Sequence, residues 1–106
     1  MDPKDLLHAM KRIAAVDPSF SFSQLQVLME IYMSDGNLKA TDIATRLGTN
    51  PATVGRFLDK ISYGYHGQEG LNWVRRVKPG EGDDRRHRRL EMTAEGRRFM
   101  DTVLTP

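Results

Sequence analysis

The stretch Asn-Pro-Ala-Thr-Val-Gly-Arg-Phe-Leu-Asp-Lys-Ile, residues 50–61, decides the fold of this chain. Asn50 is a good helix N-cap, and Pro51 suits the first helical position, where its missing N–H costs no hydrogen bond. Apolar residues that recur at helical spacing predict a buried face; they are Val54, Leu58 and Ile61. Hydrogen-bonding or cationic residues recur on the opposite side; they are Thr53, Arg56 and Lys60. Such a helix suits a groove of DNA, but an ordinary amphipathic surface helix has the same pattern.

The residues before this helix favour a DNA-binding helix over an ordinary surface helix. Thr41 is placed to cap a short helix over 42–47, and Gly48 stands where a helix end needs a left-handed residue. Ile43, Ala44 and Leu47 are expected to face inward. Residues 41–62 therefore predict a helix, a tight turn and a second helix, which is the helix-turn-helix pattern, although other helical hairpins can mimic it.

The residues after the helix predict a β-hairpin. Leu71, Trp73 and Val77 alternate with more polar residues, which indicates a strand over 71–77 with Trp73 half-buried. A turn follows over 78–84, and a second strand over 85–92 turns Leu90 and Met92 inward. A hairpin that follows a helix-turn-helix is a wing, here residues 71–92.

A glycine-rich loop, residues 63–70, separates the helix at 51–61 from the wing. Its Tyr63, Tyr65 and His66 would either stack on a base or a partner, or lie against the domain.

Helices are also predicted in the other parts of the chain. Asp2 and Pro3 begin a helix over 3–16. Its apolar face comprises Leu6, Leu7, Met10, Ile13 and Ala14. Ser23 and Gln26 form a capping-box pattern for a helix over 24–34, with Phe22 packing on Val27 as a hydrophobic staple. Thr93 caps a last helix over 94–104.

Length and composition predict one domain over residues 1–106, mainly α with a small β-hairpin, in a winged helix-turn-helix arrangement. The hydrophobic fraction is 39% and the charged fraction 28%, as in globular proteins. Cysteine is absent, no apolar run is long enough to span a membrane, and the N-terminus does not resemble a signal peptide. These features favour a cytoplasmic protein.

The positive charge is concentrated in the C-terminal third of the chain. Net charge is only +2, but residues 71–98 hold nine of the 16 Lys and Arg residues against five Asp and Glu. A local basic patch on a nearly neutral chain favours a polyanion-binding surface.

The run Asp-Arg-Arg-His-Arg-Arg-Leu-Glu-Met-Thr-Ala-Glu-Gly, residues 84–96, resembles the wing and exit signature of the MarR family of winged-helix transcription regulators. Two further motifs are similar to that family. Gly70-Leu71 followed by Arg75-Arg76 resembles its entry into the wing, and residues 41–48 resemble its first helix-turn-helix helix. The resemblance covers residues 23–100 and is most specific in the wing.

This resemblance implies a regulator that binds double-stranded DNA. It implies that Arg86 enters the minor groove and that Asp84 holds it, while Thr53, Arg56 and Lys60 occupy the outward positions of the recognition helix. An arginine-rich wing tip also suits a narrow, electronegative minor groove. Phosphate contacts are expected from Lys78, Arg85 and Arg88. Arg56 has the donor geometry to read a guanine edge.

Two departures from the family leave questions open. The loop at 63–69 is longer than the family's usual direct step from recognition helix to wing strand. The family dimerises through long terminal helices, whereas here the first helix is short and the chain stops about ten residues after Gly96. A homodimer and a monomer both stay open, and no small-molecule effector is carried over.

Catalysis and cofactor binding find little support in the sequence. There is no cysteine nucleophile, no histidine pair at metal-ligand spacing and no phosphate-binding Gly-Lys-Ser/Thr run, so we expect neither an enzyme nor a metal site. The alternative to a DNA-binding regulator is a winged-helix protein-interaction module, an inhibitor or adaptor that docks through its wing or the 63–69 loop.

Overall fold

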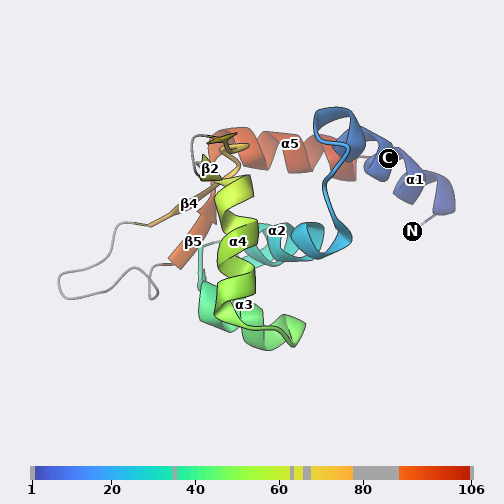
Figure 1. Ribbon diagram of the computed structural model, residues 1–106. Helices are drawn as coiled ribbons and strands as arrows, with labels where there is room; N and C mark the ends of the chain where they lie inside the picture. Colours follow the sequence, from blue (N-terminus) through green and yellow to red (C-terminus); the bar gives the residue numbers. More distant parts are fainter. Residues whose placement is uncertain (1, 35, 63, 66–67, 78–88, 106) are drawn as a thin grey trace.

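The computed structural model describes residues 2–34, 36–62, 64–65, 68–77 and 89–105, and within them there are five helices and five short strands (Figure 1). In chain order they are α1 (Pro3–Val16), α2 (Phe22–Ser34), β1 (Leu38–Lys39), α3 (Ala40–Leu47), α4 (Pro51–Ile61), β2 (Gly64–Tyr65), β3 (Gln68–Glu69), β4 (Val74–Arg76), β5 (Arg89–Met92) and α5 (Ala94–Leu104). The predicted class, mainly α with a small β-hairpin in a winged-helix arrangement, is confirmed.

The strands β1, β5 and β4 form an antiparallel sheet in that order. Leu38 of β1 is opposite Leu90 of β5, and Val74 of β4 is opposite Met92. Strand β1 was not predicted, because Thr41 was expected to cap the next helix and no element was expected between residue 34 and that cap. Helix α3 instead begins at Ala40, directly after β1, and the Lys39 N–H donates to Asp42 Oδ2 at 2.9 Å.

The main core lies between α2, α3, α4 and the sheet. Its fully enclosed side chains include Leu28, Ile43, Leu58 and Leu90. A smaller cluster joins α1 to α5 through Ala9, Ile13 and Val103. Phe20 and Phe99 pack against both clusters, so they connect the helix-turn-helix part to the layer of α1 and α5.

Helix α2 begins two residues earlier than predicted. The Ser21 hydroxyl accepts from the Gln24 N–H at 3.1 Å, and the Gln24 side chain accepts from the Ser21 N–H at 2.8 Å. The capping box is therefore Ser21 with Gln24, not Ser23 with Gln26. Phe22, the expected staple, lies in the first helical turn with 75% of its surface exposed.

The connection from α4 to the wing differs from the prediction in two ways. Residues 64–69, expected as a loop, contain the paired strands β2 and β3. The alternating strand expected from Leu71 begins only at Val74, because Asn72 has a φ of 57° and breaks the extended backbone. Trp73 is consequently buried (4% exposed) beside a buried Val74, rather than half-buried.

Candidate nucleic-acid interface

Helix α4 has the local structure that its sequence predicts. Asn50 Oδ1 accepts from the Thr53 N–H at 2.9 Å, and Pro51 occupies the first turn. The expected inner face is buried; it consists of Val54, Leu58 and Ile61. Gly48, with a φ of 67°, ends α3 and allows the chain to turn into α4. The end of α3 and the start of α4 are thus set by Gly48 and Asn50, two residues of the turn between them.

Two of the three residues expected on the outer face of α4 lie together there. Arg56 is exposed, and its Nη2 donates to Thr53 Oγ1 at 3.4 Å. The Arg56 guanidinium has unused hydrogen-bonding capacity, since it carries five donors. This part of α4 can therefore present a planar cationic donor to an external acceptor.

Lys60, the third residue, is held by the turn between α1 and α2. Its Nζ lies 2.7 Å from Asp17 Oδ2, donates to Ser19 Oγ at 3.0 Å, and lies 5.8 Å from the centroid of the Phe20 ring. The hydrogen bond from Lys60, together with those from Ser19, lowers the pKa of the Asp17 carboxyl below its ordinary range. The C-terminal end of α4 is thus fastened to a segment about forty residues earlier in the chain.

The roles of Asp17 and Ser19 were not predicted, because the sequence pattern places them only in the link between the helices at 3–16 and 24–34. An Asx-turn pattern was the available signal. Asp17 Oδ1 accepts from the Ser19 N–H at 3.0 Å and from the Ser19 hydroxyl at 2.7 Å. Nothing in the local sequence indicates that Asp17 Oδ2 forms an ion pair with Lys60.

The first residues of the wing are hydrogen-bonded to the end of α4, although the segment with β2 and β3 separates them in the chain. The N–H groups of Leu71, Asn72 and Trp73 donate to the carbonyls of Lys60, Ser62 and Ile61, at 2.9, 2.8 and 2.8 Å. These bonds satisfy carbonyls that a helix end leaves without partners. They also fix the first wing strand relative to α4.

The described part of the wing is basic. Arg75 of β4 pairs with Glu91 of β5 across the two strands, and exposed Arg89 begins β5. The wing-tip residues predicted to contact DNA lie outside the described residues, as does Asp84, predicted to hold Arg86, so their roles stay predictions; the predicted contacts are Lys78, Arg85, Arg86 and Arg88.

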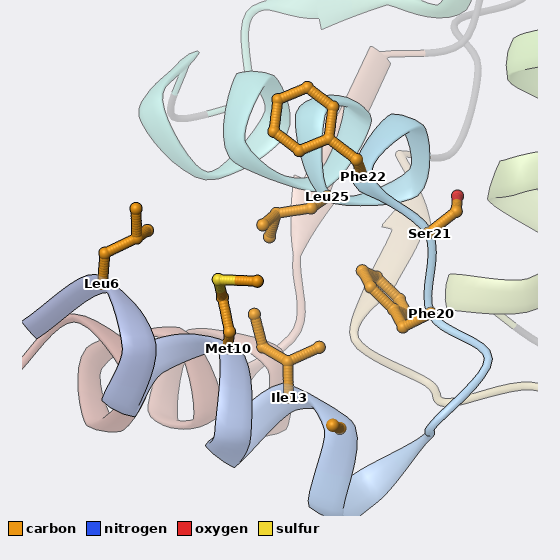
Figure 2. Close-up of a pocket in the computed structure, with 8 residues that line it drawn as sticks. Leu6, Met10, Ile13, Phe20, Ser21, Phe22 and Leu25 are labelled. Carbon is orange, nitrogen blue, oxygen red and sulfur yellow. The ribbon is translucent and has the colours of Figure 1, made fainter. Parts of the chain in front are cut away.

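An apolar groove lies between α1 and the start of α2 (Figure 2). Its volume is about 320 Å³, and its walls include Leu6, Met10, Ile13, Phe22 and Leu25. Of the expected apolar face of α1 only Ile13 is buried, since Leu6, Leu7 and Met10 are about half exposed (50%, 49% and 54%) and Ala14 is exposed. Ala9, which was not predicted to belong to this face, is buried.

Within the described residues, no three His, Cys, Asp or Glu side chains are grouped as a metal ion would require. None of the described helices combines the length and apolar character needed to cross a bilayer.

Comparisons with known proteins bear on the fold. Neither a protein family nor a curated protein matches the sequence. Among solved structures, this chain is similar to RV1404 from Mycobacterium tuberculosis, with a TM-score of 0.66 and 24% sequence identity. The match covers 92% of this chain and 60% of the RV1404 chain, so this chain spans about three fifths of that chain's length. The likeness shows a shared fold.

Proposed function

We propose that this protein is a transcription regulator that binds double-stranded DNA, with α4 in the major groove and the wing arginines in the minor groove. The observation that carries the proposal is the outer face of α4, where exposed Arg56 lies beside Thr53 on a helix whose other face is buried. A helix fixed to a core on one side and offering a guanidinium on the other suits a base edge.

The surroundings of α4 support the same function. The first residues of the wing are hydrogen-bonded to the C-terminal end of α4, and its described strands carry Arg75, Arg76 and Arg89. The resemblance of residues 84–96 to the wing of MarR regulators agrees with this arrangement. We include in the proposal a cytoplasmic location and no catalytic activity.

The proposal is tested by fluorescence-anisotropy titrations of wild type, Arg56→Ala and Arg86→Ala with randomised and selected DNA duplexes over a series of salt concentrations. We expect binding that weakens steeply with salt, because each neutralised phosphate releases counterions. Arg86→Ala should weaken binding to all duplexes without unfolding the protein. Arg56→Ala should reduce the preference for selected over randomised duplexes, by about 1–3 kcal/mol if it reads a guanine.

Failure to bind any duplex at low salt would contradict the proposal and favour the protein-interaction alternative. Equal losses on selected and randomised duplexes for Arg56→Ala would contradict base reading by this residue, while leaving DNA binding itself intact.

A further inference from the structure

Lys60 lies on the same face of α4 as Thr53 and Arg56, because residues seven apart are separated by almost two full helical turns. Unlike exposed Arg56, it has three partners on the turn between α1 and α2: the Asp17 carboxylate, the Ser19 hydroxyl and the Phe20 ring. The side chains of Lys60 and Asp17 are only 29% and 17% exposed. The ammonium group of Lys60 is therefore neutralised within the molecule.

The two oxygens of the Asp17 carboxylate have different partners. Oδ1 accepts both hydrogen bonds from Ser19 and holds the turn. Oδ2 alone pairs with Lys60. The ion pair can consequently be removed without disturbing the turn, because an asparagine can keep its carbonyl oxygen towards Ser19 and present its amide group to Lys60.

We propose that Asp17 limits the DNA affinity of this protein by holding the Lys60 ammonium group away from the phosphate backbone. The proposal rests on the proposed function. The cationic part of the outer face of α4 then ends at Arg56, and a phosphate that approached Lys60 would have to displace a carboxylate already 2.7 Å from it. Asp17 is on this basis an affinity determinant that need not touch DNA.

The proposal is tested by measuring DNA affinity over a salt series for wild type, Asp17→Asn, Lys60→Met and the double variant. Asp17→Asn should bind roughly fivefold more tightly at low salt, since it frees one cation for one phosphate. The slope of log K against log salt should become steeper by about 0.9, the increment for one phosphate contact. In the Lys60→Met background the same Asp17→Asn substitution should produce much less gain.

Asp5→Asn is the control for net charge. It removes one negative charge in the first turn of α1, far from α4 (Figure 1), and should change the affinity much less than Asp17→Asn. Far-UV circular dichroism of each variant checks that the fold is kept.

The outcomes separate this proposal from the proposed function. Wild type that binds DNA while Asp17→Asn binds no more tightly would overturn the role of Asp17 and leave the regulator intact. An equal gain in DNA affinity from Asp17→Asn with and without Lys60 would overturn it too. Loss of the repulsion between the Asp17 carboxylate and the DNA phosphates would then explain the gain. If neither wild type nor Asp17→Asn binds DNA, both the role of Asp17 and the proposed regulator function are overturned.

Discussion

The missing Cβ of Gly96 allows α5 to lie against the start of the wing. A Cβ built at this position would collide with the Trp73 carbonyl group and lie 2.7 Å from Trp73 Cα. The Gly96 N–H donates to Thr93 Oγ1, which in turn donates to the Asn72 carbonyl at 2.7 Å. Gly96 closes the motif that resembles the MarR wing exit, and here its role is packing.

We expect Gly96→Ala to destabilise the protein by about 2 kcal/mol or more, since backbone atoms cannot move aside as a flexible side chain can. Gly55→Ala in α4 is the matched control, because nothing lies within 4 Å of a Cβ added there. It should stabilise the protein by roughly 0.5–1 kcal/mol. Urea unfolding measures both, and similar effects of the two substitutions would contradict the close approach.

Asp17 provides a second prediction at the scale of single residues. Its pKa is lowered chiefly by the hydrogen bond from Lys60, so the charged form is favoured in the folded state. Its contribution to stability should be present above its ordinary pKa and be lost as the pH falls through the lowered value. Carbon-13 NMR titration of the carboxyl group should give a midpoint that rises in Lys60→Met. An unchanged midpoint would rule out the pairing in solution.

At the scale of elements, the start of α2 is a choice between two overlapping signals. Ser21 with Gln24 and Ser23 with Gln26 both match the capping-box pattern, and both precede apolar residues. The earlier start brings Leu25 against the cluster of α1 and α5. It also leaves Phe20 outside the helix, near Lys60 of α4 and the Trp73 ring. Packing with distant elements therefore selects one of two locally acceptable caps.

This choice of cap predicts that two similar substitutions lower the stability of the protein by different amounts. Ser21→Ala should destabilise the protein by about 1 kcal/mol, because the Gln24 N–H loses its acceptor. Ser23→Ala should change stability by less than about 0.5 kcal/mol, since it lies on the exposed side of the first turn. Thermal unfolding of the two variants distinguishes the boxes, and the reverse order would place the cap at Ser23.

At the scale of the whole molecule, aromatic rings connect the two hydrophobic clusters. The Trp73 ring is stacked on Phe99 with centroids 4.1 Å apart, and Phe20 lies 5.9 Å from it on an inclined plane. Figure 1 shows α1 and the end of α5 at one end of the molecule, away from α3, with α2 between. Trp73 thus reports on the junction between the helical layer and the helix-turn-helix part.

We expect the two parts to unfold together, because Phe20 and Phe99 pack against both clusters. Trp73 is the only tryptophan in the chain. Its emission should shift to longer wavelength on unfolding, in a transition that coincides with the loss of far-UV circular dichroism. Two separate transitions would show that the layer of α1 and α5 unfolds independently.

The sequence alone determined the features that depend on neighbours within about one helical turn. The Asn50 and Thr93 caps, the glycine that ends α3, and the buried face and bounds of α4 were all predicted and are confirmed. So was the burial of Leu90 and Met92 in the second wing strand. Side-chain caps and residue periodicity are local interactions, and they act in the same way before the chain is folded.

Only the tertiary structure decided which distant groups meet. The sequence correctly placed Thr53 and Arg56 outward, but it gave no sign that Lys60 would pair with Asp17 or that β1 would join β5. Asn72 likewise breaks its strand so that the wing can bond to the end of α4. These contacts depend on the direction in which each element leaves the core, and that direction is set by packing among elements far apart in the chain.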